Sequence, residues 1–371
     1  MIKENLFDRN LIKNPPLSQR LNKIDIAKGV IQDPFNINTI DKNKINKIME
    51  ISHYITKAKR KKASAMCVFG AHTIKNCLGP LLGDYIQNRW FSHLATNGAG
   101  VIHDWEFAYQ GQSSEDVREN VQKGWFGTWE ETGLYINIAL TIGAFEGMGY
   151  GESIGAMIHN NGFTVPDRLE LQHIIENPNP LWKKAAAADL LNLIIELNLP
   201  AGYYMVTHPW AQYSIQARCY ESGVPFTSHP MFGHDIIYTH KANNGSVIGR
   251  TAERDFLSFA SSVSRLEHGV YLSVGSAVMS PMIFEKSLSM ARNILLQKGE
   301  NIRNCHIYVV DLHESTWDWS KGEPPQENPA YYHRFMKTFY RMGCPVEYIS
   351  MDNRQFFLTL NRLLHDQSEN A

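Results

Sequence analysis

Short apolar, β-prone runs alternate with helical stretches along most of this chain. The runs that we expect to be strands lie at 63–70, 91–96, 202–207, 235–239, 269–275, 305–311 and 345–350. Their nearly continuous apolarity is typical of strands that are buried on both faces. Because such alternation builds a parallel sheet covered by helices, we predict an α/β protein with a Rossmann-like, doubly wound, mostly parallel sheet.

Two regions depart from this alternation and predict the domain organisation. Residues 1–45 are polar and contain Pro15 and Pro16, so we expect an N-terminal arm. Residues 46–371 should form the α/β domain. Within it, residues 113–198 read as consecutive helices, the first capped by Ser113 or Ser114, and predict a helical insertion beside the sheet.

Charge and cysteine content limit the partners of the chain. The 371 residues carry 36 basic and 37 acidic side chains, a net charge of −1, which offers no field to attract nucleic acid or an anionic membrane. We therefore expect a small-molecule substrate. The five cysteines are scattered without a C-x-x-C pair, which predicts reduced, buried thiols in a cytoplasmic protein. No apolar run is long enough to predict a membrane span.

The segment from Phe91 to Glu106 is the strongest candidate for a site. An apolar strand is followed by Asn97-Gly98-Ala99-Gly100 and then by His103, Asp104 and Glu106. We expect Gly98 and Gly100 to adopt positive φ angles in a tight turn before a helix. A strand, a glycine turn and a helix N-terminus form the arrangement that holds dinucleotides in open α/β sheets. The pattern G-x-G-x-x-H lacks the third glycine of the usual fingerprint.

Polar or titratable residues also follow the other predicted strands. Since the carboxyl ends of parallel strands share one edge of a sheet, we expect these residues to line a common crevice. They are Gly70, His72, Thr207, His208, His229, His234, Asp235, His240, Gly275, Ser276, Asp311, His313, Glu314 and Asp352. The aromatic loop 317–325, which begins at Trp317, is a candidate lid, aromatic wall or oligomer contact.

Two patterns raise hydrolase alternatives. His229, His234, Asp235 and His240 lie within twelve positions, but a strand between His234 and His240 would hold them apart, so we predict no metal site. The run Gly151-Glu-Ser153-Ile-Gly155 matches G-x-S-x-G, a serine nucleophile motif that requires a preceding strand. The residues before it read as a helix, so close helix packing is the favoured interpretation.

Three segments resemble deoxyhypusine synthases. The first runs from Ser222 through Gly233-His-Asp235 to His240, and resembles that family's turn, Gly-Asp pair and histidine. The second is Asn97-Gly-Ala-Gly100 with the acids that follow, which resembles the family's glycine turn and acidic pair. The third is Val346 to Asp352, which resembles its terminal strand and aspartate. The resemblance covers about residues 60–365 and implies the family's NAD-binding fold.

The resemblance also implies site residues. It places NAD contacts at Asn97, Gly98, Ala99, Gly100, Gly275, Ser276 and Asp352. Asp104, Glu106 and Asp235 would face a cationic or polyol substrate, and we add His240, Glu314 and Trp317 as further substrate contacts. The family forms homotetramers, so a homodimer or homotetramer with an N-terminal arm is expected.

The chain departs from that family at the catalytic lysine. The family's Trp-Gly-Lys motif is absent, and only Trp319-Ser-Lys321 is similar, at a shifted position. We therefore predict a divergent NAD-dependent enzyme that transfers hydride without synthesising deoxyhypusine. His103 or His208 would act as general base, with Lys321 as a further catalytic candidate. A serine or metal hydrolase and a non-catalytic nucleotide- or sugar-binding protein are the alternatives.

Overall fold

The computed structural model describes residues 7–30 and 40–369, and its centre is one parallel sheet. The strand order is β10-β9-β8-β2-β3-β7, and every neighbouring pair is parallel. The strands are β2 (Ala65–Phe69), β3 (His93–Thr96), β7 (Phe226–Ser228), β8 (Val270–Val274), β9 (His306–Asp311) and β10 (Val346–Ser350). If these six strands are numbered 1 to 6 along the chain, their order across the sheet is 6-5-4-1-2-3. This is the doubly wound order of dinucleotide-binding sheets. The predicted fold class is confirmed.

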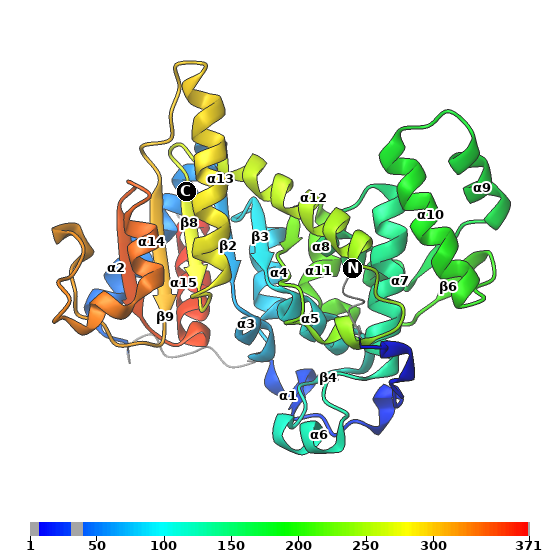
Figure 1. Cartoon of the computed structure of the whole chain (residues 1–371). Helices are drawn as coiled ribbons and strands as arrows, with labels where there is room; N and C mark the ends of the chain where they lie inside the picture. The colour runs from blue at the N-terminus through cyan, green and yellow to red at the C-terminus, as the bar shows by residue number, and fades with distance from the viewer. Residues whose placement is uncertain (1–6, 31–39, 370–371) are drawn as a thin grey trace.

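Helices cover both faces of this sheet (Figure 1). One face is covered by α12 (Gly245–Val263), α13 (Met279–Leu296) and α14 (Arg334–Tyr340). The other is covered by α2 (Lys42–Lys61), α4 (Gly79–Gln87), α5 (Gly98–Gln110), α8 (Tyr150–His159), α11 (Ile215–Ser222) and α15 (Asn353–Glu369). Strand β2 is buried at all five positions, and its alternate residues enter the two cores. That is why it reads as continuously apolar.

The chain changes direction in the sheet between β2 and β8. From β2 it winds outward through β3 and β7, and it then returns to place β8 on the other side of β2. A crevice for ligands opens outside the carboxyl ends of strands at such a point. The backbones come very close there, because a Cβ at Gly70 would lie 2.0 Å from the carbonyl oxygen of Gly275.

The connection from β3 to β7 carries most of the remaining structure. It contains β4 (Gln112–Ser113), α6 (Val117–Lys123), α7 (Glu130–Glu146), β5 (Gly162–Val165), α9 (Arg168–Glu176), α10 (Leu181–Glu196) and β6 (Gly202–Met205), besides α5, α8 and α11. In Figure 1, α9, α10 and β6 lie at the end of the molecule opposite α14 and β9. The cap of α6 is Asp116, not Ser113 or Ser114 as expected. The boundaries 1–45, 46–371 and 113–198 stay predictions.

Two of the predicted strands do not belong to the central sheet. Residues 202–207 contain strand β6, but it pairs antiparallel with β5 outside the central sheet. Residues 236–239 form the 3-10 helix η5 (Ile236–Thr239), and the sheet instead ends in β7, which the sequence did not predict. Ile237 and Tyr238 of η5 are buried. Their apolar, β-prone character therefore serves packing in a loop.

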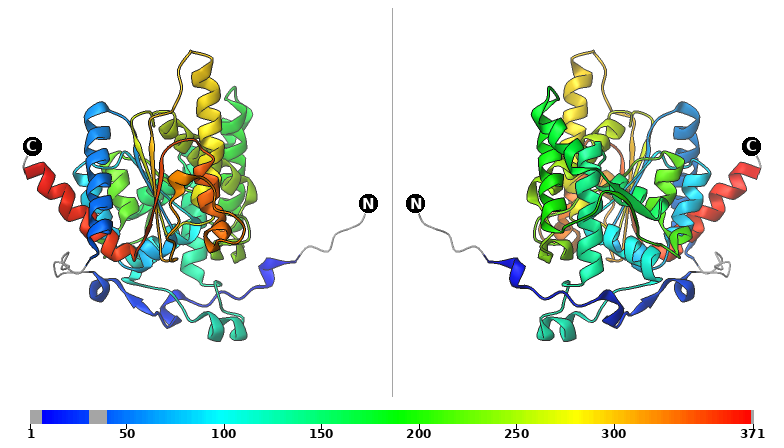
Figure 2. Two further views of the ribbon diagram at one scale, coloured as in Figure 1. Left: turned by 90° about the vertical axis from the view of Figure 1, so that its left-hand side faces the viewer. Right: turned by 90° about the vertical axis from the view of Figure 1, so that its right-hand side faces the viewer.

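Between Phe7 and Val30 the N-terminal arm lies along the lower edge of the molecule, below the sheet (Figure 2). Its strand β1 (Ile24–Asp25) pairs antiparallel with β4. The backbone nitrogen of Leu17 donates to Glu131, and Arg9 donates to Asn243. The arm is therefore docked on its own chain.

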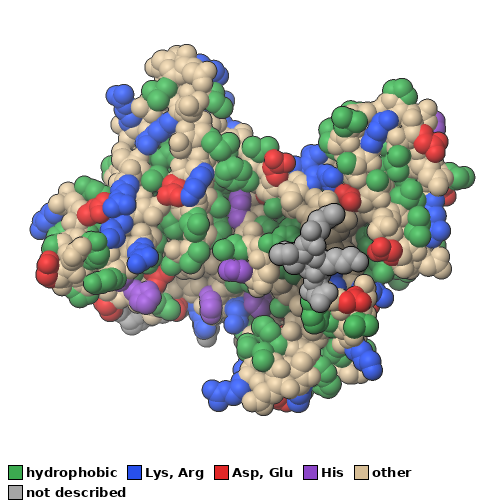
Figure 3. Space-filling model, viewed as in Figure 1, with side chains coloured by type: hydrophobic (Ala, Val, Ile, Leu, Met, Phe, Trp, Pro, Cys, Tyr) green, Lys and Arg blue, Asp and Glu red, His purple; other side chains and the backbone are tan. Residues whose placement is uncertain are grey.

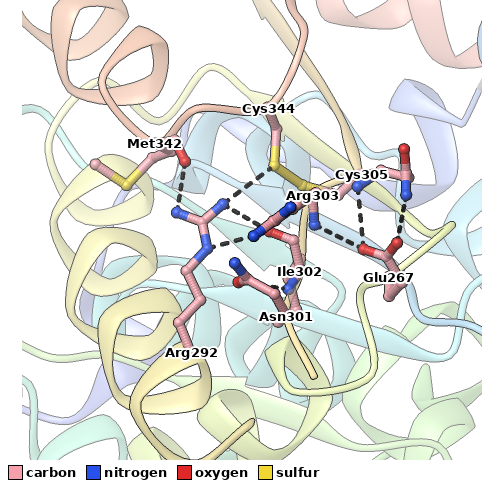
Figure 4. The surroundings of a disulfide bond; sticks show 9 residues. Glu267, Arg292, Asn301, Ile302, Arg303, Cys305, Met342 and Cys344 are labelled. Atoms are coloured by element: carbon pink, nitrogen blue, oxygen red, sulfur yellow. Dashed lines mark hydrogen bonds between the residues drawn. A yellow bond between two sulfur atoms is a disulfide. The ribbon is translucent and has the colours of Figure 1, made fainter. Parts of the chain in front are cut away.

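Two of the five cysteines are joined, which corrects the expectation that all are reduced. Cys305 and Cys344 form a disulfide, with Cα atoms 5.6 Å apart (Figure 4). Cys305 directly precedes β9 and Cys344 lies two residues before β10, so the pairing of these two strands brings them together. Cys67, Cys77 and Cys219 are free and buried. In the described residues, no helix combines the length and apolarity that crossing a membrane requires.

Candidate functional site

A cavity of about 210 Å³ lies beside the carboxyl end of β3 and the first turns of α5. Its lining comes from the arm, the helix after β2, α5, the segment around α6 and the loop before η5. The residues that line it are Arg20, Lys75, Ala99, Ile102, His103, Glu106, Ser114, Glu115, Val117, Phe126, His234, Asp235 and Ile236. Several predicted site residues therefore meet in one place.

The glycine turn before α5 has a different geometry from the one predicted. Gly98 and Gly100 are helical and have no positive φ. They are needed because neighbours approach closely: a Cβ at Gly98 would lie 2.2 Å from Oδ2 of Asp235, and one at Gly100 would lie 2.3 Å from Oγ1 of Thr96. Asn97 caps the helix by accepting a hydrogen bond from the nitrogen of Gly100 at 3.0 Å. Because Gly98 has no side chain, the Asp235 carboxyl can lie against the start of α5.

Asp235 is the unpartnered acid of the cavity. Its residue is 9% exposed, and Oδ2 is buried without a hydrogen-bond partner in the described part of the chain. Burial raises the pKa of Asp235 to about 7. A buried carboxyl without partners costs free energy in the unliganded protein. A ligand that donates hydrogen bonds or carries positive charge would relieve that cost.

Glu106, another predicted substrate contact, already accepts hydrogen bonds from other side chains of the protein. Nη1 and Nη2 of Arg20 donate to its two oxygens at 2.7 and 2.6 Å, and the hydroxyls of Ser113 and Thr132 donate at 2.5 and 3.1 Å. Burial opposes ionisation of Glu106, but Arg20 outweighs it and holds the pKa of Glu106 below its usual value. The carboxylate therefore anchors the arm and orients Ser113.

The hydrogen bonds around Ser113 fix the tautomer of His103. The Ser113 hydroxyl gives its single proton to Glu106, so its oxygen must accept from Nδ1 of His103 at 2.7 Å. Burial lowers the pKa of His103 to about 4, although Glu106 acts in the opposite direction. The ring is thus neutral near pH 7 and carries its proton on Nδ1. Its Nε2 lone pair has no partner among the described residues and can accept a proton or a hydrogen bond.

Asp104 points away from this cavity. Its Oδ1 accepts from the nitrogen of Ile215 at 3.1 Å, and its Oδ2 accepts from the hydroxyl of Ser214 at 2.6 Å. The backbone nitrogen and side-chain amide of Gln216 also donate to Oδ2. Asp104 therefore caps the N-terminus of α11, and we do not carry it into the proposed site.

The other predicted catalytic residues lie elsewhere. His208 is buried after β6 against the rings of Trp105 and Tyr109. The side chain of Lys321 is 73% exposed in η6 (Trp319–Lys321) and lies 3.7 Å from Asp318. The structure brings neither of them to the cavity.

Three predicted substrate contacts are also outside the cavity. His240 accepts from the nitrogen of Ala242 and lies 3.3 Å from Glu130 beside α7. Glu314 is exposed, and Trp317 donates to the carbonyl of Gly322 at 2.9 Å within its own loop. We leave all three out of the proposed site.

The remaining predicted cofactor residues lie at strand ends. Gly275 has φ +58°, and no atom lies within 4 Å of the Cβ position, so the backbone is open to a ligand there. The Ser276 hydroxyl accepts from the nitrogen of Ser280 at the start of α13. The Asp352 carboxylate accepts from the nitrogen of Arg354 at 2.9 Å and caps α15.

The sequence did not single out Lys75 or Arg20. Lys75 lies in the short helix α3 (Ala71–Lys75), five residues beyond Gly70, and lines the cavity beside His103. Its charge is one of the causes that lower the pKa of His103. The only signal in the sequence was its place in the segment that follows a predicted strand. Histidine side chains gather over the centre of the face in Figure 3, above the lobe that contains α6.

The hydrolase motif does not form a nucleophile turn. Ser153 lies inside α8, where its hydroxyl donates to the carbonyl of Gly149 at 2.6 Å. A Cβ at Gly143 would lie 1.9 Å from that hydroxyl, so the glycine allows α7 and α8 to pack closely, as the sequence favoured. Within residues 7–30 and 40–369, no group of three or more His, Cys, Asp or Glu side chains is placed to hold a metal ion.

No protein-family model and no curated protein sequence matches the chain. A solved structure described as a conserved LOR/SDH protein from Methanococcus maripaludis S2 is similar at 11% identity and a TM-score of 0.42, over 91% of this chain and 74% of that one. AgrE in a ternary complex with ornithine and NAD+ is similar at 11% identity and a TM-score of 0.44, over 90% of this chain.

ArgZ, an arginine dihydrolase from the ornithine-ammonia cycle in cyanobacteria, is similar at 11% identity and a TM-score of 0.42, over 91% of this chain. The present chain spans only 34% of the length of AgrE and of ArgZ. None of these structures is described as a deoxyhypusine synthase. Similarities this distant assign neither a family nor an activity.

Proposed function

We propose that the chain is an NAD-dependent enzyme that transfers hydride to or from a small cationic or polyol substrate. The observation that carries this proposal is the cavity with the free carboxyl of Asp235 and the free Nε2 of His103, beside a doubly wound sheet of dinucleotide-binding order. In such sheets the nucleotide lies at the carboxyl ends of the strands where the order reverses.

The backbone at the reversal point fits a nucleotide. Gly70 and Gly275 meet there with no room for a side chain at Gly70, and open space lies beside Gly275. We place the cofactor along Gly275 and Ser276, with Asn97 to Gly100 and Asp352 as the further contacts implied by the resemblance. When bound, NAD supplies a hydride acceptor.

The residues of the cavity have distinct roles in this proposal. Asp235 holds the ammonium or hydroxyl group of the substrate, because its buried Oδ2 has no hydrogen-bond partner among the described residues. Nε2 of His103 accepts the proton that leaves the substrate when it is oxidised. Ser113 and Glu106 keep the imidazole in the required tautomer, and Arg20 fixes Glu106.

We further propose that the chain is a divergent relative of deoxyhypusine synthases that does not synthesise deoxyhypusine. The exposure of Lys321 and its ion pair with Asp318 support the second part, since an imine-forming lysine needs a pocket that depresses its pKa. Assembly as a homodimer or homotetramer, and a cytoplasmic location, stay predictions. Light scattering of the purified chain tests the first of these.

Isothermal titration with NAD and NADH tests the cofactor assignment. Gly275→Asn places a side chain in the open space, and asparagine tolerates the positive φ there. The matched control is Gly299→Asn, since Gly299 has φ +75° and equally open surroundings beyond α13.

We expect the native protein and the Gly299 variant to bind NAD with similar affinity. The Gly275 variant should bind NAD at least about tenfold more weakly, a loss of about 1.4 kcal/mol in binding free energy. No binding of NAD or NADH to the native protein at millimolar concentration would refute the proposal. NAD binding without turnover of any amine or alcohol would favour the non-catalytic alternative.

A further inference from the structure

The charged side chains around the cavity divide into satisfied and unsatisfied groups. Arg20 and Glu106 neutralise each other at 2.6 Å. Glu115 accepts from Asn120 at 2.6 Å, from Trp129 at 3.0 Å and from the nitrogen of Gly127 at 3.1 Å. None of these three side chains needs a ligand.

Two side chains remain, one basic and one acidic. Lys75 and Asp235 both line the cavity, and neither has an ion pair or a side-chain hydrogen bond in the part of the chain that the structure describes. No salt bridge joins them across the cavity. Lys75 comes from the helix after β2, whereas Asp235 comes from the loop before η5 and lies against the start of α5.

We propose that this cavity binds a zwitterionic amino acid, with its carboxylate at Lys75 and its ammonium group at Asp235. This inference rests on the proposed function and narrows its substrate class. A polyamine would pair with Asp235 but would bring positive charge toward Lys75. A polyol would leave the Lys75 ammonium without a counter-charge. A ligand with both charges satisfies both side chains by itself.

The volume of the cavity agrees with a ligand as small as an amino acid. A cavity of about 210 Å³ is smaller than the roughly 300–1,000 Å³ of pockets for drug-sized ligands. The free Nε2 of His103 lies in the same lining. It could accept a hydrogen bond from the ammonium group, in addition to the carboxyl of Asp235.

The test compares amino acids with the amines that lack only the carboxylate. The probes are L-ornithine, L-lysine and L-arginine, each against its counterpart 1,4-diaminobutane, 1,5-diaminopentane or agmatine. Binding to the full chain is measured by isothermal titration. We expect at least one amino acid to bind at least about tenfold more tightly than its amine, a difference of about 1.4 kcal/mol.

Variants identify the side chains responsible. Lys75→Met keeps the length of the side chain and should reduce this preference to less than about twofold, whereas Lys75→Arg should retain it. Asp235→Asn should weaken the binding of amino acids and amines alike. The matched control is Lys61→Met, at the exposed end of α2. It should change neither the affinity for these probes nor the preference for amino acid over amine.

Equal or tighter binding of every amine, an unchanged preference in Lys75→Met, or no binding of any probe to the native protein would each overturn the inference. The NAD titration separates this outcome from the proposed function. If NAD binds while the amines match the amino acids, the zwitterion assignment falls and the hydride-transfer proposal stands. If NAD does not bind, the hydride-transfer proposal falls whatever the amino acids do.

Discussion

Arg20 in the N-terminal arm holds both carboxylate oxygens of Glu106 in α5, at 2.7 and 2.6 Å. The side chains are only 2% and 1% exposed, so this is a buried ion pair between segments that are 86 positions apart in the sequence. Paired hydrogen bonds of this kind fix geometry as well as charge. The arm is thereby part of the wall of the candidate site.

Removing Arg20 should be strongly destabilising. Arg20→Met leaves the Glu106 carboxylate buried without its counter-charge, and we expect a loss of about 3–5 kcal/mol in the free energy of unfolding, measured by urea denaturation. The control is Lys23→Met in the same arm, whose exposed ion pair with Asp116 should contribute nothing measurable. Equal effects of the two variants would contradict the structural role of the pair.

Adding one methyl group to Gly98 should have the opposite effect to adding one in an open helix. The Cβ of Gly98→Ala would collide with the Asp235 carboxyl at 2.2 Å, so we expect a loss of about 1–3 kcal/mol. In Gly249→Ala of α12, nothing lies within 4 Å, and a gain of about 0.5–1 kcal/mol is expected from helix propensity. Thermal unfolding of both variants is the measurement, and stabilisation by Gly98→Ala would refute the close contact.

The pH dependence of stability should report Asp235. Its pKa is raised to about 7 in the folded protein by burial, against about 4 in the unfolded chain. The native protein should therefore lose stability as the pH rises from 4 through 7, because only the unfolded state ionises this group freely.

Asp235→Asn cannot lose its proton in this range. Its stability relative to the native protein should rise between pH 4 and pH 8 by up to about 4 kcal/mol, measured by urea denaturation at several pH values. A constant difference over this range would show that the carboxyl ionises normally.

Nitrogen-15 NMR of the imidazole of His103 should show a neutral ring at pH 7 with the proton on Nδ1. Protonation should occur only below about pH 5, because burial lowers its pKa to about 4. Ser113→Ala removes the acceptor for Nδ1 and should shift the tautomer equilibrium toward Nε2. A proton on Nε2 in the native protein would contradict the assigned hydrogen-bond direction.

The Cys305–Cys344 disulfide should stabilise the β9–β10 edge of the sheet. It closes a segment with a sequence separation of 39, and its loss should lower the free energy of unfolding by about 2–5 kcal/mol. Reductant should therefore lower the melting temperature of the native protein. A variant with both cysteines changed to alanine should not respond to reductant, and equal sensitivity of the two proteins would argue against the bond.

The central sheet was predictable because its strands are buried on both faces. Ala65 to Phe69 and Val270 to Val274 carry apolar side chains to two cores at once, and this leaves a continuous pattern in the sequence. Residues 236–239 carry the same pattern, but there it serves packing in η5. Composition cannot distinguish a buried strand from a buried loop, because both need apolar side chains.

The candidate site was predictable only in part. His103, Glu106 and Asp235 follow strand or loop ends, where parallel sheets gather ligands, and they do meet at one cavity. Asp104, next to His103 in sequence, faces the opposite way and caps α11. Each step along a helix turns the side-chain direction by about 100°, so residues one or two positions apart, such as Asp104 beside His103 and Glu106, seldom share a surface.

The sequence by itself determined the alternation of strands and helices, the apolar core and the set of polar residues that end the strands, because these depend on local pattern and composition. The tertiary structure alone decided which charges are satisfied. Arg20 neutralises Glu106 across 86 positions, whereas Lys75 and Asp235 reach the same cavity without partners. Pairing depends on distances between side chains that are remote in sequence, and only folding sets those distances.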